Sequence, residues 1–359
     1  MRKPRISNVL QAFVDSQSLA GAVILVADRT KIHCLETVGF ADIDAGAPMR
    51  TNSMFWIASQ TKPITATALM MLVDEGKVQL DDPVAKYLPE FASQWLAVEQ
   101  DAEHVLLRKP QHLPTVREAL CHTSGMPFTS AIEVPTLDRL PLEYAVRSYA
   151  MTPLQSEPGS KYQYSNAGIN VAGRIIEVVS GQSYAEFLDQ RLLEPLGMKD
   201  TTFWPSAKQL ARLARSYKPN ATGTGLEALD ISQLAQLPLT SRLRHAVPAG
   251  GLFATARDVS RFCQMILNNG VFAGKRYVSE AAVKDMTTRQ TGAGIEENYG
   301  LGWGLGDGTA SHGGAQATNM IIDWPRGLIT VFLVQHCGFP KDGAKSQTAF
   351  RDAVMAAYA

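Results

Sequence analysis

Strand-like segments lie at the two ends of this 359-residue chain, and a helix-rich stretch separates them. Residues 21–42 read as two strands around a polar turn at residues 28–31. Residues 299–336 read as further antiparallel strands, with a turn at residues 325–327. Strands at both ends predict one sheet to which both ends of the chain contribute.

Helix signals fill the middle of the chain. Capping boxes, in which a Ser or Thr precedes an acidic residue by three positions, occur at 115–118, 183–186 and 255–258. The helix expected after the second box should stop before Pro195. Residues 167–181 read as a buried helix that Gly181 closes.

The pattern as a whole predicts an α/β (α+β) chain, an antiparallel sheet flanked by helices. We expect residues 1–83 and 246–359 to form the sheet domain and residues 84–245 a mainly helical inserted domain. Short amphipathic helices are expected at residues 6–19 and 346–359, and the second of them should pack on the sheet.

The charge balance excludes several classes of partner. Lys plus Arg and Asp plus Glu number 34 each, so nothing favours nucleic acid or an anionic membrane. No stretch approaches the ~20 apolar residues of a membrane span. The first residues lack the apolar core of a signal peptide, so a cytoplasmic location is expected, with a periplasmic or secreted one if a signal was removed. The expected partner is a small molecule, and the sequence does not indicate an oligomeric state.

The four cysteines, Cys34, Cys121, Cys263 and Cys337, are far apart and form no Cys-x-x-Cys pair. Zinc and iron–sulfur spacings are therefore absent, and no metal or cofactor is expected. We expect all four to be small buried hydrophobic residues.

One Ser-x-x-Lys pattern occurs in the chain, at Ser59 and Lys62, and Pro63 follows it. Because proline is tolerated only in a first helical turn, a helix should begin at about Ser59 and run to about residue 75. The three-residue spacing puts the Ser59 hydroxyl and the Lys62 amine on one face of this helix, close enough to share a proton. Alternatively, Ser59 only caps the helix and Lys62 lies at the surface.

Two further motifs contain polar side chains at loop edges. Tyr164 and Asn166 stand just before the buried helix, where they either face a cleft or serve as an aromatic packing residue and a helix cap. His312-Gly313-Gly314 precedes a strand, and its glycines allow a ligand close to the backbone. A rival histidine, His336, follows a strand and is interpreted as structural.

Other hydrolase and nucleotide motifs are missing: no Gly-x-Ser-x-Gly, His-Glu-x-x-His, Walker loop or dinucleotide fingerprint occurs. The order Ser-x-x-Lys, Tyr-x-Asn, His-x-Gly resembles that of the serine β-lactamase and penicillin-binding-protein superfamily. Segments 120–127, 194–203 and 248–270 also resemble hallmarks of that family. Over nearly its whole length the chain is similar to the branch of class C β-lactamases, D-alanyl-D-alanine carboxypeptidases and family VIII carboxylesterases.

This resemblance implies a β-lactamase/transpeptidase-like fold with the active site between the two domains. It also implies that Ser59 is the nucleophile of an acyl-enzyme and Lys62 its proton acceptor. Tyr164 would pass the proton to the leaving group, and Asn166 would lie beside the substrate. Lys62 can act as a base at neutral pH only if burial or a second cation lowers its pKa.

The resemblance also implies roles for the late motif. His312, Gly313 and Gly314 take the place of the Lys-Thr-Gly of β-lactamases, and the N–H groups of Ser59 and Ala315 would form the oxyanion hole. Histidine is mostly neutral at pH 7 and should titrate near pH 6.5, and Gly313 has no hydroxyl, so recognition of a carboxylate should be weak.

A carboxylesterase acting on short-chain esters is therefore the first expectation. The alternatives are a D-amino-acid peptidase or amidase and a weak β-lactamase. A non-catalytic ligand-binding member is disfavoured, because Ser59, Lys62 and Tyr164 are all present.

Overall fold

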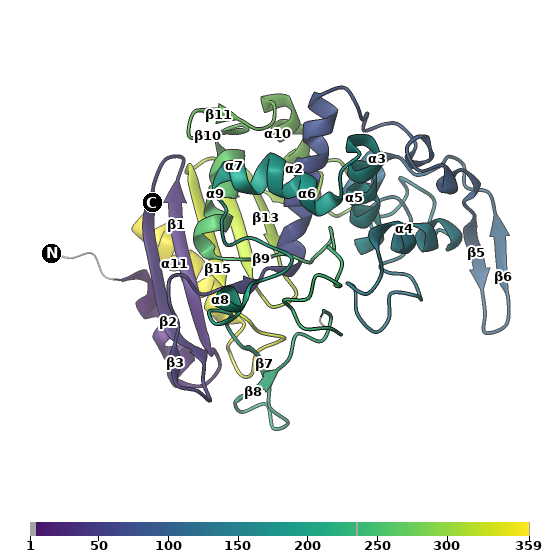
Figure 1. The fold of residues 1–359 in the computed structure, drawn as a ribbon. Coiled ribbons are helices and arrows are strands. Elements are labelled where there is room, and N and C mark those ends of the chain that lie inside the picture. Colours follow the sequence, from purple (N-terminus) through teal and green to yellow (C-terminus); the bar gives the residue numbers. More distant parts are fainter. Residues whose placement is uncertain (1–4, 235, 359) are drawn as a thin grey trace.

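A seven-stranded antiparallel sheet joins the two ends of the chain (Figure 1). The computed structural model describes residues 5–234 and 236–358. The strand order is β12-β13-β14-β15-β1-β2-β3. The strands are β1 (Gly21–Asp28), β2 (Ile32–Asp42), β3 (Ala47–Pro48), β12 (Gly304–Gly306), β13 (Thr309–Gly313), β14 (Asn319–Asp323) and β15 (Leu328–Leu333). β1 pairs with β15, with Val23 opposite Leu333, so both ends of the chain contribute to one sheet, as predicted.

The sheet is covered on both faces, which explains why β1 is apolar on both sides. Val23 and Leu25 pack into the main core, which α9 (Ala256–Leu267) also enters. Ile24 and Val26 face the opposite side and pack with Phe350 of α11 (Lys345–Ala357). The predicted packing of the last helix on the sheet is confirmed. The expected helix at residues 6–19 is shorter: η1 (Ile6–Leu10) and α1 (Gln11–Asp15) end before the left-handed turn at Gln17.

Helix α2 (Thr61–Asp74) lies in the core, preceded by the 3₁₀ turn η2 (Ala58–Gln60). It packs on α5 (Asn166–Ser180) and reaches the main core that contains the inner face of the sheet. The helical turns begin at Ala58, one residue before the predicted Ser59, with Pro63 near their start. Because α2 is buried almost throughout, its polar side chains can be retained only where they find partners.

The capping predictions are confirmed at two of three sites. Reciprocal boxes cap α3 (Val116–Leu120) and α6 (Tyr184–Leu188), and α5 ends at Gly181 with φ +72°. The third prediction was wrong in part. Thr255 caps α9, but the Asp258 carboxylate accepts hydrogen bonds from Asp200 N and Thr201 Oγ1 instead of completing the box.

Two other local predictions needed correction. The helical run after residue 188 continues through the π-helical turn η5 (Asp189–Leu193) and α7 (Glu194–Leu196), so it includes Pro195 in the first turn of α7. The strand expected from residue 299 begins only at β12. Before it, Gly302 has φ +76°, and a Cβ there would lie 2.9 Å from Ala66 Cβ, so this segment turns tightly onto α2.

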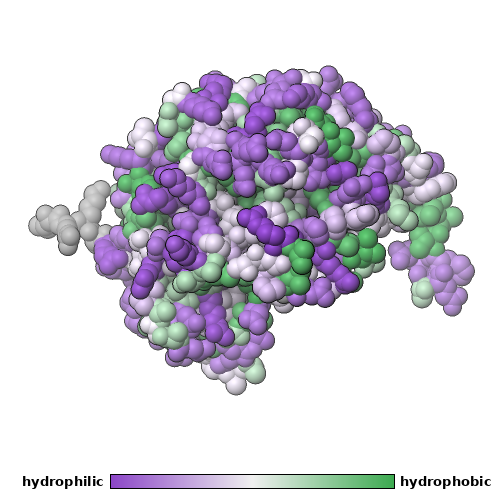
Figure 2. Space-filling view, in the orientation of Figure 1, coloured by the Kyte–Doolittle hydropathy of each residue, from purple (hydrophilic) through white to green (hydrophobic). Residues whose placement is uncertain are grey.

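In the part of the chain that the structure describes, four short strand pairs, three further α-helices and the 3₁₀ turns η3 (Val84–Lys86) and η4 (Pro89–Ser93) complete the fold. The strand pairs are β4 (Phe55–Trp56) with β9 (Phe253–Ala254), β5 (Leu96–Gln100) with β6 (Val105–Arg108), β7 (Ser216–Pro219) with β8 (Leu226–Leu229), and β10 (Val271–Phe272) with β11 (Lys275–Arg276). The helices are α4 (Leu142–Met151), α8 (Ala207–Leu210) and α10 (Glu280–Met286). Figure 1 shows the β5–β6 hairpin projecting far from the sheet, and Figure 2 shows a hydrophobic patch at its base.

Helices predominate between residues 84 and 245, although the two hairpins β5–β6 and β7–β8 also lie there. The domain boundaries at 83/84 and 245/246 stay a prediction. Among the described residues, no helix has both the length and the apolar character needed to cross a membrane.

The four cysteines are free, and three of them are buried as expected. Cys337 is exposed, so that prediction was wrong for this residue: it lies in the surface loop after β15. His336 is buried, and its Nε2 accepts a hydrogen bond from Ala20 N at 3.1 Å, which agrees with its structural interpretation.

Candidate active site

Ser59 stands where a strand gives way to a helix. Ala58, the residue before it, has φ +46°, a left-handed conformation that non-glycine residues rarely adopt. Such strained positions cost on the order of 1–3 kcal/mol and cluster at functional sites. Ser59 is half-buried between buried neighbours, and it lines a pocket.

Lys62 is fully buried beneath Ser59. Its Nζ lies 3.1 Å from Ser59 Oγ, 2.8 Å from Asn166 Oδ1 and 2.7 Å from the carbonyl oxygen of Ala249. Burial lowers the pKa of Lys62 well below its ordinary value. The alternative of a surface lysine is therefore wrong, and the pair lies within hydrogen-bonding distance, as its spacing predicts.

Tyr164 completes this cluster. Its hydroxyl is hydrogen bonded to Ser59, and its ring centroid lies 4.7 Å from Lys62 Nζ. Burial raises the pKa of Tyr164 to about 12, so the phenol is neutral at physiological pH. The neighbouring Ser165, and not Asn166, caps α5, which leaves the Asn166 amide free to contact Lys62.

The pocket above these side chains has a volume of about 460 Å³. It is lined by Trp56, Ala58, Ser59, Phe128, Thr129, Glu133, Pro135, Leu137, Tyr164, Asn166, Gln233, Ala249, Gly250 and Ala315. None of these described lining residues is a lysine or an arginine. Its one carboxyl group, on Glu133, accepts hydrogen bonds from Tyr149 Oη at 2.5 Å and Ser130 N at 2.7 Å, and burial raises its pKa.

The His312-Gly313-Gly314 motif, at the end of β13, lies close to the segment that precedes Ser59. A Cβ on Gly314 would lie 2.5 Å from the carbonyl oxygen of Ile57, so only glycine allows the two segments to come this close. This approach brings Ala315 to the pocket. Within the described ranges, 5–234 and 236–358, the Ala315 N–H has no hydrogen-bond acceptor.

His312 is buried, and neither it nor Gly313 or Gly314 lines the pocket. Its Nδ1 lies 2.7 Å from the Gly313 carbonyl oxygen, which can only accept, so Nδ1 carries the proton. Nε2 then accepts from the hydroxyl of Tyr299 at 3.0 Å. Burial and the nearby Lys62 lower the pKa of His312 to about 3, so the expected titration near pH 6.5 is wrong.

The model of the Beta-lactamase family matches residues 6–354 of this chain. The chain belongs to the β-lactamase family. The resemblance noted from the sequence is therefore confirmed, and so is the β-lactamase/transpeptidase-like fold, with its antiparallel sheet and flanking helices.

Three proteins are similar to this β-lactamase-family chain over at least 90% of its length. Protein Rv1367c of Mycobacterium tuberculosis is 33% identical, over 90% of this chain and 87% of its own. Esterase EstB of Burkholderia gladioli is 30% identical, over 98% of this chain and 95% of its own. The solved structure of EstCE1, described as a hydrolase with promiscuous acyltransferase activity, has a TM-score of 0.81 at 24% identity, covering 98% of this chain and 97% of that one.

Two residues of this β-lactamase-family site, His122 and Tyr299, were not predicted. His122, with φ +62°, accepts a hydrogen bond from Ser165 N at Nδ1 (3.2 Å), and its ring lies 4.5 Å from that of Tyr164 and 4.9 Å from that of Tyr299. Burial lowers the pKa of His122. Both occur in segments the sequence made conspicuous, LCHTSGMP and YGLGW, but neither segment indicates its contacts.

Proposed function

We propose that this chain is a serine hydrolase that forms an acyl-enzyme at Ser59 and acts as a carboxylesterase on short-chain esters. The observation that carries the proposal is the surroundings of Lys62 Nζ. A neutral amine has two N–H groups and one lone pair. Asn166 Oδ1 and the Ala249 carbonyl oxygen accept the two N–H groups, so the lone pair is left to face the Ser59 hydroxyl.

Lys62 would take the proton of Ser59 as Oγ attacks the ester carbonyl. The N–H groups of Ser59 and Ala315 would hold the resulting oxyanion, an arrangement commonly worth several kcal/mol. Tyr164, hydrogen bonded to Ser59, would relay a proton to the departing alcohol. Water would then attack the acyl-enzyme, release the acid and restore the Ser59 hydroxyl.

The charges around the pocket support an uncharged ester, and not a β-lactam with its carboxylate, as the substrate. His312 is neutral, and its two nitrogens are already hydrogen bonded to Gly313 and Tyr299. Because the pocket lining contains a carboxyl group and no lysine or arginine among the described residues, a substrate carboxylate would find little to bind it. A volume of about 460 Å³ suits a small ester, and the relative EstB is an esterase.

A substrate panel tests the proposal. Purified protein is assayed with p-nitrophenyl esters, nitrocefin and D-alanyl peptides, and short-chain esters should react fastest. Ser59→Ala should abolish turnover and leave the fold intact, because a helix-end serine contributes only ~1 kcal/mol of capping. A fluorophosphonate probe should label Ser59. Labelling of another serine, or faster turnover of D-alanyl peptides, would contradict the proposed chemistry or favour the peptidase alternative, respectively.

A further inference from the structure

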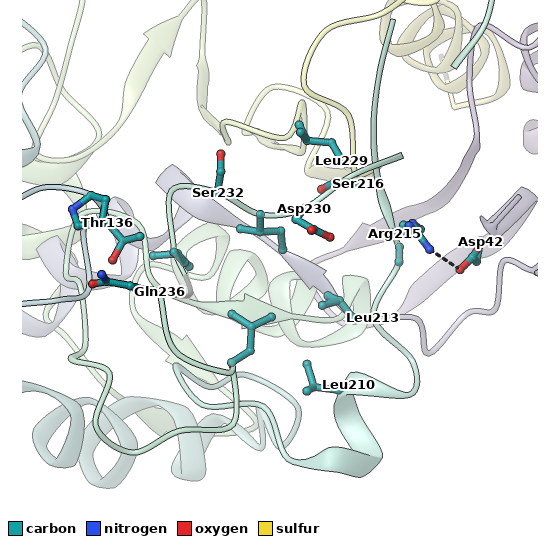
Figure 3. A pocket seen from close by; sticks show the side chains of 15 residues that line it. Asp42, Thr136, Leu210, Leu213, Arg215, Ser216, Leu229, Asp230, Ser232 and Gln236 are labelled. Atoms are coloured by element: carbon teal, nitrogen blue, oxygen red, sulfur yellow. Dashed lines mark ion pairs between the residues drawn. The ribbon is translucent and has the colours of Figure 1, made fainter. Parts of the chain in front are cut away.

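Figure 3 shows a second cavity, of about 650 Å³. We call it the distal groove. Its lining includes Pro135, Thr136, Leu210, Leu213, Arg215 and Leu229. Pro135 lines both the distal groove and the active-site pocket. The two cavities are therefore neighbours that share a wall.

Two segments of the chain build this wall. Leu137 N donates a hydrogen bond to the Gln233 carbonyl oxygen at 3.0 Å, and both residues line the active-site pocket. Their neighbours Thr136, Ser232 and Leu234 line the distal groove. Pro135 and this pair of segments therefore separate a molecule bound at Ser59 from the groove.

The floor of the groove is also tied to the nucleophile. Ala214 N donates to the Met54 carbonyl oxygen at 2.9 Å, which places the Leu213–Ala214 segment against the start of the strand that continues through Trp56 to Ser59. Leu213 packs on the same hydrophobic cluster as Trp56 and Ala58. Ser59 lies five positions after Met54, at most about 17 Å of extended chain.

The wall is held in place before any ligand binds. Asp138 and Arg244 form a buried ion pair at 2.5 Å, and both side chains are at most 3% exposed. Arg244 also donates to the Leu239 carbonyl oxygen at 2.8 Å, on the rim of the groove. A groove that is already formed binds without the cost of ordering its walls.

The lining of the groove combines leucine side chains with polar and charged ones. Figure 3 shows Leu210 and Leu213 between Thr136 with Gln236 on one side and Arg215 on the other. Arg215 is paired with Asp42 at 3.7 Å, whereas the Asp230 carboxylate, also in the lining, has no ion-pair partner among the described residues. The leucines suit a hydrocarbon body, and the Asp230 carboxylate disfavours an anionic ligand.

The Thr136 hydroxyl suggests that the ligand carries a polar group. The residue is only 7% exposed, and its hydroxyl has no hydrogen-bond partner in the part of the chain that the structure describes. A buried hydroxyl without a partner is unfavourable, and native proteins rarely keep one. Because the hydroxyl oxygen is itself buried, the Thr136 side chain would have to turn towards the groove before a ligand oxygen there could accept its proton.

We propose that the distal groove binds the alcohol half of the ester substrate, a long or bulky apolar alcohol that carries an ether or carbonyl oxygen for Thr136. The inference rests on the proposed function, in which the acid half is short and stays at Ser59. The alcohol half is then the part of the substrate large enough to fill a cavity of about 650 Å³.

Two series of esters test the assignment. Butyrate esters of straight-chain alcohols from ethanol to octanol are hydrolysed in a pH-stat, and kcat/KM should rise at least about tenfold from butyl to octyl, since each buried methylene can add up to about fourfold. Leu229→Trp in β8 should remove this rise, and the matched Leu106→Trp in the exposed strand β6 should keep it. A rise that survives Leu229→Trp, or one seen only with ethyl esters of longer acids, would overturn the assignment.

Thr136→Val tests the anchoring oxygen. Octyl butyrate is compared with a butyrate whose alcohol has the same number of chain atoms and one ether oxygen. Loss of the hydroxyl should reduce the preference for the ether roughly 2–10-fold, while the melting temperature stays unchanged or rises, because no internal hydrogen bond is lost. An unchanged preference would contradict the role of Thr136. Absence of ethyl butyrate hydrolysis in the unmodified protein would instead refute the proposed function itself.

Discussion

The Tyr299 hydroxyl donates to His312 Nε2 at 3.0 Å and so holds the imidazole in one neutral tautomer. This contact explains how a buried histidine can stand at this position without supplying a positive charge. It also ties the turn at residues 299–303 to the end of β13, from which Ala315 reaches the pocket.

Tyr299→Phe should therefore destabilise the protein and release His312. The change leaves Nε2 as a buried acceptor without a donor, which costs about 1–3 kcal/mol in the free energy of unfolding. The pKa of His312 should rise from about 3, because its protonated form no longer competes with the tyrosine donor. Urea unfolding and NMR titration of the histidines measure the two effects. Unchanged stability would mean that the hydrogen bond contributes nothing.

The pH dependence of ester hydrolysis should identify the base. Activity requires neutral Lys62, so kcat/KM for an uncharged ester should rise with pH through the lowered pKa of Lys62 and level off well below its ordinary value of 10.5. A Tyr164 phenolate acting as the base would instead give a rise that continues towards pH 12. His312, with its pKa near 3, should produce no step at pH 6.5. The profile can be measured from pH 5 to 10.

Lys62 and Tyr164 should behave as one unit. Lys62→Ala and Tyr164→Phe should each reduce kcat by several decades, and the double variant should lose little more, because both act on the proton of Ser59. Single-turnover kinetics of the three variants provides the test. Fully additive losses would show that the two side chains serve separate steps.

Esters should turn over at least about a hundredfold better than any β-lactam, in kcat/KM. The sequence resemblance implies that His312 and Gly313 replace a lysine and a threonine, whose charge-assisted hydrogen bonds to a substrate carboxylate would be worth ~1.5–3 kcal/mol each. The double change His312→Lys with Gly313→Thr should narrow the gap. The threonine fits, since a Cβ on Gly313 would meet nothing closer than the Thr318 carbonyl oxygen at 3.6 Å. Equal rates on nitrocefin and ester in the unmodified protein would contradict the substrate assignment.

One of the four cysteines should react in the native protein. Cys337 is exposed, whereas burial raises the pKa of Cys34 to about 12 and that of Cys121 to about 11, and Cys263 is fully buried. Ellman's reagent should therefore titrate one thiol rapidly and all four after denaturation. Cys337→Ser should remove the rapid phase, and two fast thiols would mean that a buried site opens.

The sequence was sufficient for features that depend on neighbours along the chain. The positions of Pro63 and the capping residue Thr115 determine where helices begin, whatever surrounds them. The Ser59–Lys62 pair lies three residues apart on consecutive helical turns, so its spacing alone predicted the contact.

Features set by distant segments could not be predicted in this way. The Asp258 carboxylate does not complete the capping box, because it accepts a hydrogen bond from the N–H of Asp200, 58 residues earlier. The contacts of His122 and Tyr299 join segments more than 170 residues apart, and the low pKa of His312 follows from burial, which only the folded chain determines.

The burial of Lys62 also links catalysis to folding. In the unfolded chain Lys62 regains its ordinary pKa of 10.5 and binds a proton that the folded chain excludes over the range between the two pKa values. Across that range, acidification favours the unfolded state, and the protein gains stability as the pH rises. The feature that makes the lysine a base at neutral pH therefore makes the fold less stable there. Lys62→Met should give an inactive protein whose stability no longer rises with pH across that range, although Asn166 Oδ1 and the Ala249 carbonyl oxygen would each lose a donor.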